Sequence, residues 1–438
     1  MKIVITDVYD LKYNFGVQGL VLPLIEKIRK YTDDASFILP VQTAYLNQPN
    51  IEFAREKGIN LIGYWKYSFI IDLFYPLIRL INIFSFSSIP GKASKSKPGP
   101  LSLYRELAGT IKSADMVIDV AGIEFIGNNK YKYKWGELFF TRMFQKMAGR
   151  FGVSYFKYTK SYGPLEGFLF RWMAKKLLAE LPFLFIRGSN NLEEMKKFDL
   201  KTPMYLFPDV SLILKPSPKE KAMSYLKSLG VDIDQPLVGI SPSRVLSKIA
   251  VTNPENTVGN NHRELVKKFI REYLALGYQV LIIPHAMDRI DRKKCDWKLS
   301  LEILNEIGNP ENVCLTGEDL SYADTRAVIG LLSFYVTGRY HSVASALYMG
   351  VPVICLAWHI KYIDIMSEFL DDFLAVDCRN TGINDAWLLI RKYHEDMSWF
   401  DRQKIRSNRL RIERQVERSI KMIMEYAHVA RLESSFDN

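Results

Sequence analysis

The sequence predicts an α/β protein of two doubly wound, Rossmann-like domains that face a cleft, with a C-terminal helical extension. Short apolar strands alternate with amphipathic helices along most of the chain, which is the pattern of parallel sheets covered by helices. The 438 residues are too many for one hydrophobic core and suit two domains. The stretch Val336–Leu356 predicts a strand, a turn, a helix and a second strand. Such a unit implies parallel strands joined by a right-handed crossover.

Changes in composition along the chain predict the domain boundaries. Prolines and alternating charges after Leu214 indicate a linker, and a new apolar strand begins at Leu237. The end of the chain is basic and has helical periodicity, and we expect it to pack back toward the first domain. The predicted parts are a first Rossmann-like domain over 1–214, a linker over 215–236, a second Rossmann-like domain over 237–383 and a helical tail over 384–438.

The composition excludes several classes of protein. Hydrophobic residues make up 48% of the chain, which is typical of a globular protein and not of a disordered one. The four cysteines form no CxxC pair, which predicts reduced thiols with no disulfide or metal role. The net charge of +11 suits acidic small molecules, phospholipid head groups or nucleic acid. No nucleic-acid motif accompanies it, so we expect no nucleic-acid partner. The chain enters a strand at its start without a signal-peptide pattern, which predicts a cytoplasmic protein.

Residues 61–90 are unusually apolar. Asp72, Pro76 and Arg79 interrupt the segment and argue against a membrane-spanning helix, which needs about 20 mainly apolar residues. Two interpretations stay open, a buried helical hairpin or a surface element that contacts the bilayer or a lipid-linked substrate. The second would hold the protein peripherally on the inner face of the membrane.

Polar side chains follow several predicted strands at the edge where ligands bind in open parallel sheets. Arg339 and His341 come between the strand and the helix of the unit described above. The helix N-terminus and the guanidinium supply positive charge there, and the imidazole can exchange a proton near neutral pH. Arg187 and His285 follow other strands in the same way. The alternative is that each residue has a structural role, but their shared position predicts an anion site beside a proton donor.

Three helix ends carry capping residues. Gly350 follows the helix of small residues in Val336–Leu356, where a left-handed residue commonly ends a helix. We expect Ser189 and Ser321 to be the N-caps of two further helices.

Four short pieces of the chain occur in a characteristic order: Ile186-Arg187-Gly188-Ser189, Pro208-Asp209, Ile283-Pro284-His285 and Gly338-Arg339-Tyr340-His341. With these pieces the chain resembles the polysaccharide pyruvyl transferase family. Tyr340 stands where the family signature Arg-Leu-His has leucine, and Lys361 stands where the family usually has a lysine. The likeness is strong over 180–365 and weaker near the start of the chain.

This resemblance implies a GT-B-like fold and a ketal-forming transferase. Such an enzyme moves the pyruvyl carbons of phosphoenolpyruvate onto two hydroxyls of one sugar and releases phosphate. The acceptor would belong to a surface polysaccharide, such as an exopolysaccharide, or to a lipid-linked glycan. Phosphoenolpyruvate would be a co-substrate, with no further cofactor and no metal.

The resemblance also implies roles for the residues that match the family. His341 is the expected general acid/base, and His285 is the second candidate for that role. Arginine forks bind carboxylate and phosphate bidentately, so Arg187 and Arg339 are expected to hold the donor anions. Lys361 and Ser189 are expected to assist in binding the donor.

The first domain departs from the family pattern and is expected to hold the acceptor. The family often opens with Asn-x-Gly-Asp, whereas here Asn14 and Gly16 are followed by Val17. The later glycine-rich turn is reduced to Ala121-Gly122, followed by Glu124. Asn14, Gly16, Gly122 and Glu124 are the predicted acceptor-side residues, and glycines there let a ligand approach the backbone.

Two other functions stay open at this point. A GT-B nucleotide-sugar glycosyltransferase would place a diphosphate at a helix N-terminus and use a carboxylate, Glu318 or Asp319, for the ribose hydroxyls. A non-catalytic glycan-binding member of a polysaccharide assembly pathway would bind sugar and release no phosphate.

Overall fold

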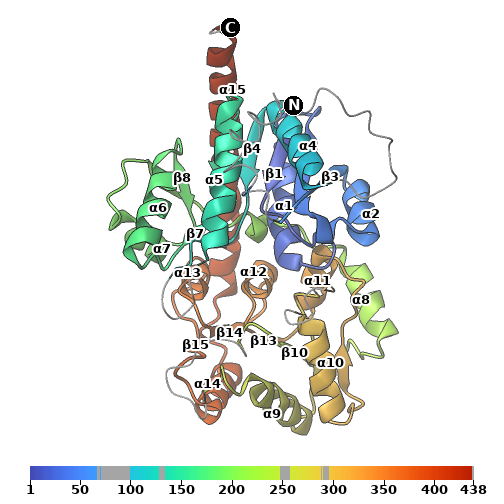
Figure 1. The fold of residues 1–438 in the computed structure, drawn as a ribbon. Coiled ribbons are helices and arrows are strands. Elements are labelled where there is room, and N and C mark those ends of the chain that lie inside the picture. Colours follow the sequence, from blue (N-terminus) through green and yellow to red (C-terminus); the bar gives the residue numbers. More distant parts are fainter. Residues whose placement is uncertain are drawn as a thin grey trace.

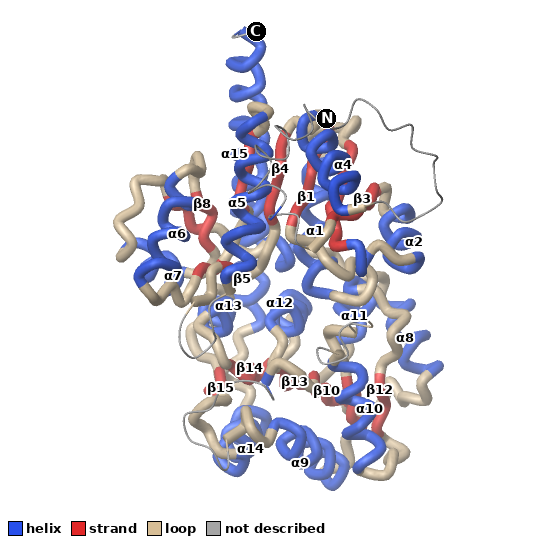
Figure 2. Tube along the Cα trace, in the orientation of Figure 1, coloured by secondary structure: helices blue, strands red, loops and turns tan. Residues whose placement is uncertain are grey.

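The computed structural model describes residues 1–66, 70, 99–127, 134–246, 257–287, 289 and 295–436. It contains two parallel sheets with helices on their faces, one above the other in the view of Figure 1. The long helix α15 (Arg402–Phe436) runs from the lower half up beside the upper sheet. Figure 2 shows the strands of each sheet enclosed by helices. Most of the segment 61–90 lies outside the described residues, so both interpretations of it stay open.

The first sheet has the strand order β3-β2-β1-β4-β6, and all neighbouring strands are parallel. Residues 116–119 of β4 are buried without interruption, as expected for a strand covered on both faces. The strands are β1 (Lys2–Thr6), β2 (Ser36–Gln42), β3 (Ile59–Tyr64), β4 (Met116–Asp119) and β6 (Ser154–Lys157). The helices connected to them are α1 (Phe15–Arg29), α2 (Gln48–Glu56), α4 (Pro100–Lys112) and α5 (Trp135–Arg150).

Two short parallel strand pairs extend the first half of the chain. They are β5 (Ile123–Glu124) with β7 (Ser161–Tyr162), and β8 (Leu184–Ile186) with β9 (Met204–Leu206). Helix α6 (Phe168–Ala179) leads into β8, and α7 (Ser189–Lys196) follows it. The short 3-10 helix η2 (Val210–Ile213) ends this half.

The second sheet has the order β12-β11-β10-β13-β14-β15, again with parallel neighbours. Its strands are β10 (Leu237–Ser241), β11 (Gln279–Ile282), β12 (Val313–Leu315), β13 (Phe334–Thr337), β14 (Val353–Ala357) and β15 (Ala375–Asp377). The helices of this half are α8 (Lys219–Ser228), α9 (His262–Ala275), α10 (Asp296–Glu306), α11 (Tyr322–Ile329), α12 (Tyr340–Met349), α13 (Lys361–Ser367) and α14 (Ile383–Glu395).

The predicted strand–helix–strand unit is confirmed as β13-α12-β14, and its two strands are parallel. Gly350 follows α12 with φ +72°, the left-handed conformation expected of it. Ser321 caps α11 with a capping box: its side chain accepts a hydrogen bond from the Asp324 backbone N–H, and the Asp324 carboxylate accepts one from the Ser321 backbone N–H.

The prediction for Ser189 is wrong by one residue. Helix α7 begins at Ser189, and Gly188 is its N-cap, with φ +89°. A Cβ atom at Gly188 would lie 2.2 Å from Oδ2 of Asp364. Asp364 belongs to α13 and accepts hydrogen bonds from both the backbone and the side chain of Asn190. Glycine is therefore required because a carboxylate from the other half of the chain presses against this turn.

Helix α15 contacts both halves. Near its start, Arg411 donates a hydrogen bond to the Glu368 carbonyl (2.8 Å). Further along, Ser419 is hydrogen-bonded to Tyr158 beyond β6 (2.8 Å), and Glu417 is ion-paired with Lys27 of α1. One cluster of buried apolar side chains includes residues of β1, α1, α12 and α15. Among the residues described, no helix combines the length and apolar composition needed to cross a bilayer.

Candidate active site

A cavity of about 370 Å³ lies where the carboxyl ends of strands from both sheets approach each other. The lining residues follow β1, β4, β8, β11, β13 and β14, the sheet edge where ligands bind in such folds. Eight of the predicted site residues line it: Asn14, Gly16, Gly122, Arg187, His285, Arg339, His341 and Lys361. The structure thus brings two arginines, two histidines and a lysine, distant in sequence, to one cavity.

Arg187 is held by contacts on each of its guanidinium nitrogens. Nη1 is ion-paired with Asp209, Nε donates to Ser161 Oγ (3.2 Å), and Nη2 donates to the Gly122 carbonyl (2.7 Å). The guanidinium carbon lies 4.5 Å from the ring centroid of Tyr340. Burial disfavours ionisation, but the charges around the group, including Asp209, raise the pKa of Arg187. The side chain is a fixed cation that joins the Gly122 loop to the start of α12.

Arg339 lies between β13 and α12, as the sequence predicts, and its guanidinium contacts α10 of the same half. Nη2 is ion-paired with the buried carboxylate of Asp296. Asp296 also accepts hydrogen bonds from the backbone N–H groups of Arg244 (2.9 Å) and Ala286 (3.1 Å). Within the described chain, the buried Nε of Arg339 has no hydrogen-bond partner. This donor is available to an anion in the cavity.

His341 lies in the first turn of α12 and faces the start of α1. A Cβ atom on Gly16 would lie 3.0 Å from its Nδ1, so the close approach of the ring depends on glycine at that position. Its buried Nε2 has no hydrogen-bond partner among the described residues. Burial, reinforced by the charges of Arg187 and Lys361, lowers the pKa of His341 to about 3, although Asp209 opposes the shift. Burial and the neighbouring cations thus favour the neutral imidazole.

His285 packs more tightly than His341. Its ring makes edge contacts with Phe15 and Tyr322, with centroid distances of 5.2 Å and 5.4 Å. Both ring nitrogens are buried without a hydrogen-bond partner in the described structure. Burial, followed by the charges of His341 and Arg339, lowers the pKa of His285 well below its usual value.

Lys361 begins α13 and lies among three aromatic rings. Its ammonium is 4.9 Å from the Trp358 ring centroid, 5.1 Å from that of Tyr362 and 5.5 Å from that of Tyr340. Burial, followed by the charges of Arg187 and Arg339, lowers its pKa to about 7. An anion in the cavity would stabilise the ammonium, so Lys361 is suited to hold a phosphate or to give up a proton.

Two predicted residues lie elsewhere. Ser189 is exposed at the start of α7 and does not line the cavity. Glu124 is buried in β5 behind the cavity wall, where it is ion-paired with Lys157 and Lys160 and accepts a hydrogen bond from Thr141. Its carboxylate is therefore part of a buried charge network beside the predicted acceptor side.

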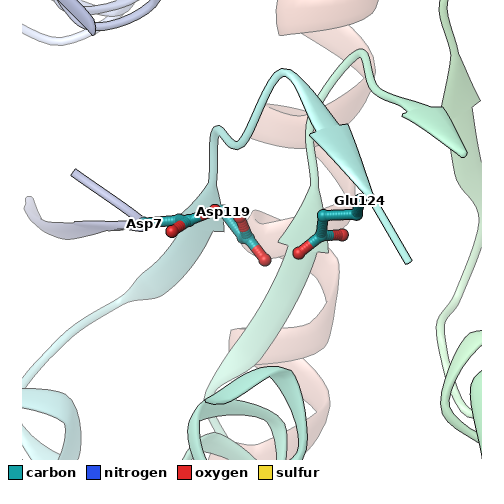
Figure 3. A group of neighbouring side chains, drawn as sticks. All are labelled: Asp7, Asp119 and Glu124. Atoms are coloured by element: carbon teal, nitrogen blue, oxygen red, sulfur yellow. The ribbon is translucent and has the colours of Figure 1, made fainter. Parts of the chain in front are cut away.

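Asp7 is a cavity residue that the sequence analysis did not identify. It follows β1 with φ +62°, an uncommon conformation for a residue other than glycine. Its carboxylate lies close to those of Asp119, at the end of β4, and Glu124 (Figure 3). Although Asp7 opens to the cavity, desolvation and then the charge of Asp119 raise its pKa to about 7. The sequence predicts a strand over Lys2–Val8, which includes Asp7, whereas β1 ends at Thr6 and leaves Asp7 at the carboxyl end of the strand.

The three carboxylates have ligand atoms within 4.8 Å of one another, so they are a candidate metal group. Two buried ammonium groups occupy this neighbourhood already. Lys157 is ion-paired with Asp119 (2.8 Å) and Glu124 (2.6 Å), and Lys160 is ion-paired with both. Burial opposes ionisation of Asp119, yet the charges of the two lysines lower its pKa. The lysines supply the positive charge that a cation would otherwise bring, and the prediction that no metal is needed stays a prediction.

Solved structures with similar folds are GT-B glycosyltransferases and epimerases. Sucrose-phosphate synthase from Thermosynechococcus elongatus has a TM-score of 0.55 and 10% identity, covering 99% of this chain and 100% of that chain. A UDP-GlcNAc 2-epimerase from Methanocaldococcus jannaschii, in complex with UDP-GlcNAc and UDP, has a TM-score of 0.52 and 11% identity, covering 97% and 100%. At these identities the likeness confirms the predicted fold alone.

The sequence comparisons address the family. Curated protein sequences give no match. A family model described as polysaccharide pyruvyl transferase matches residues 16–360, which is most of the chain. That range includes Arg187, His285, Arg339 and His341, which the structure brings to one cavity. The chain belongs to the polysaccharide pyruvyl transferase family.

Proposed function

We propose that the protein transfers the pyruvyl group of phosphoenolpyruvate to two hydroxyls of one sugar in a polysaccharide or lipid-linked glycan. The products are a cyclic ketal and inorganic phosphate. The observation that carries the proposal is the convergence of Arg187, Arg339 and Lys361 with the unpaired nitrogens of His285 and His341 in one cavity. The protein would act in the cytoplasm, as its sequence predicts.

The cationic side chains suit a donor with two anionic groups. Phosphoenolpyruvate carries a carboxylate and a phosphate, and guanidinium forks bind both in planar pairs. Arg339 offers its unpaired Nε, and Lys361 offers an ammonium with no carboxylate at ion-pair distance in the described structure. Arg187 is held by Asp209, Ser161 and Gly122 and contributes its fixed charge. Arg187 and Arg339 are already paired with Asp209 and Asp296, so a neutral ligand would leave only the Lys361 ammonium without an anionic partner among the described residues.

His341 is the proposed proton donor to the methylene carbon. Its pKa of about 3 in the empty cavity reflects burial beside cations. Binding of a phosphate and a carboxylate would reverse the sign of the local charge and favour the imidazolium. The proton then passes to the methylene carbon, and the neighbouring carbon becomes an oxocarbenium centre open to a hydroxyl.

Asp7 is the proposed base for the acceptor. It lies on the wall formed by the first sheet, which is the predicted acceptor side, and ionises near neutral pH. In the balanced reaction two sugar hydroxyls lose their protons and two C–O bonds form. One proton is gained by the methylene carbon, the C–O bond to phosphate breaks, and the other proton leaves with the phosphate. A carboxylate that accepts and returns protons completes this exchange.

A phosphate-release assay tests the proposal. Purified protein with phosphoenolpyruvate and a saccharide extract should release phosphate only when both are present, and mass spectrometry should detect the ketal on the sugar. Thermal shift with phosphoenolpyruvate against UDP-sugars tests the nucleotide-sugar alternative. Stabilisation by UDP-sugars alone would overturn the proposal, and sugar binding without phosphate release would indicate a glycan-binding protein. Glu318 and Asp319, the predicted candidates for the ribose hydroxyls, do not line the cavity, and Glu318 is ion-paired with Arg289.

The pH dependence of kcat/KM is expected to be bell-shaped and centred near pH 7. Asp7 must be ionised to act as a base, so activity rises as the pH increases through its pKa of about 7. Lys361 must be protonated to hold the phosphate, so activity falls as the pH increases through its pKa of about 7. Asp7→Asn should abolish the fall of kcat/KM at low pH and lower the maximum kcat/KM by about 10²-fold. Lys361→Arg should move the alkaline limb to higher pH, because arginine stays protonated.

Gly16→Ala should lower turnover by about tenfold without lowering the unfolding temperature. The added methyl would meet His341 Nδ1 at 3.0 Å, so the ring must move by a few tenths of an ångström. Alanine is otherwise favoured over glycine in a helix. Gly109→Ala in α4 is the matched control, because a Cβ there has nothing within 4 Å. Equal turnover in the two variants would contradict the position proposed for His341.

A further inference from the structure

Helix α6 exposes three large apolar side chains near its start. Phe168, Leu169 and Trp172 are 88%, 56% and 54% exposed. The opposite face of the helix is buried in the core around the first sheet through Phe170 and Ala174. The exposed trio is therefore not part of that core, and burying it elsewhere would be favourable.

Basic side chains surround this trio. Helix α6 carries Arg171, Lys175 and Lys176 and contains no acidic residue. Helix α5 packs beside α6. Residues of both helices line a groove of about 190 Å³, among them Arg142, Lys146, Trp172 and Lys176, and Glu180 also lines it. Lys176 Nζ lies 5.8 Å from the Trp172 ring centroid.

We propose that α6 and the adjoining side of α5 dock on an anionic lipid bilayer. Aromatic and aliphatic side chains flanked by lysine and arginine are the composition of helices that lie in the membrane interface. Phe168, Leu169 and Trp172 enter the boundary between head groups and acyl chains. The basic side chains contact lipid phosphates, and the groove between α5 and α6 receives one of them.

A bilayer fits this surface better than a second copy of the chain. An isologous dimer through α6 would bring two sets of lysines and arginines together, and like charges across an interface are costly. An anionic bilayer would bury the same apolar side chains, and its phosphates would neutralise the lysine and arginine charges around them. The residues of this surface are not part of the apolar segment 61–90.

Helix α5 links the docking surface to the cavity. Lys134 and Glu137, at the start of α5, line the cavity, whereas Arg142 and Lys146 line the groove. At a rise of 1.5 Å per residue, Glu137 and Lys146 are about 14 Å apart along the helix. A glycan attached to a lipid phosphate in the groove would therefore have to extend only about this distance to enter the cavity. This last step rests on the proposed function, whereas the docking itself does not.

Co-sedimentation of the full-length protein with vesicles tests the inference. The protein should bind vesicles of equal parts phosphatidylglycerol and phosphatidylcholine, bind phosphatidylcholine alone much less, and lose affinity as salt is added. The double variant Phe168→Ser/Trp172→Ser should bind about tenfold more weakly, and so should Lys146→Glu/Lys176→Glu. Leu388→Ser is the matched control, because Leu388 on α14 is 63% exposed but lies outside this surface.

Three outcomes would overturn the inference. In the first, the wild-type protein binds neither kind of vesicle. In the second, the variants bind vesicles as well as the wild type does. In the third, sedimentation equilibrium shows a dimer of the wild type that the substitutions Phe168→Ser/Trp172→Ser dissociate. Circular dichroism of each variant checks that the fold is kept. Phosphate release with a soluble sugar should be unchanged in the α6 variants. A protein that releases no phosphate but binds vesicles through α6 would refute the proposed function and leave this inference standing.

Discussion

Replacing His341 with asparagine should lower kcat for phosphate release by about 10²–10⁴, the range of a lost general acid. Asparagine keeps a polar group of similar size next to Gly16 but cannot donate a proton to carbon. Thermal unfolding should change little, because Nε2 makes no hydrogen bond among the described residues that the substitution would break. Turnover close to that of the wild type would remove His341 from the reaction.

Proton uptake gives His341→Asn a second readout. Because the pKa of His341 is about 3 in the empty cavity, the ring is neutral at pH 7 and should gain a proton when the donor binds. Titration calorimetry in two buffers of different ionisation enthalpy should detect uptake by the wild type and less by the variant. His285→Asn is the comparison, because His285 is the other candidate donor. If His285→Asn lowered both kcat and proton uptake more than His341→Asn does, His285 would be the proton donor and His341 would not.

Replacing Arg187 with lysine should raise the KM for phosphoenolpyruvate by about 10–100-fold and change kcat less. Lysine keeps the charge but cannot contact Asp209, Ser161 Oγ and the Gly122 carbonyl at once, as the planar guanidinium does. The Gly122 loop and the Tyr340 ring would lose the group that connects them. Initial rates at varied phosphoenolpyruvate measure the split between KM and kcat.

A second buried arginine provides the control for Arg187→Lys. Arg326 donates to the backbone carbonyls of Leu214 and Ser211 but does not line the cavity. Arg326→Lys should lower the unfolding temperature, because a buried acceptor would lose its partner, while the KM stays near that of the wild type. An unchanged KM in Arg187→Lys would remove Arg187 from the donor site. Equal rises in KM for both variants would mean that the effect of Arg187 is general destabilisation.

The sequence was sufficient for the parts of the site that depend on strand ends. Arg187 and Arg339 each follow an apolar strand, and ligands bind at the carboxyl ends of strands in such folds. Because β8 and β13 belong to different sheets, their convergence in one cavity also depends on the two halves facing each other, which the sequence predicts. The glycine at Gly350 was predictable for the same local reason, because a helix that ends in the left-handed region favours it.

The missed or misplaced residues depend on contacts between distant segments. Glu124 is predicted to lie at a strand end, but its carboxylate is buried in ion pairs with Lys157 and Lys160. The position of these lysines depends on the pairing of β6 with β4. Ser189 is displaced from the N-cap because Asp364, more than 170 positions along the chain, requires glycine before it. The raised pKa of Asp7 depends on desolvation and on the charge of Asp119, which belongs to another strand. No local pattern encodes these pairings.

Helix α15 connects the two halves. Arg411, near its start, contacts the backbone after α13, and Glu417 and Ser419 contact Lys27 and Tyr158 of the first half. The apolar cluster that includes α15 also contains side chains from both sheets. Rotation of one half against the other would break these contacts together. We therefore expect α15 to restrict hinge bending between the two halves.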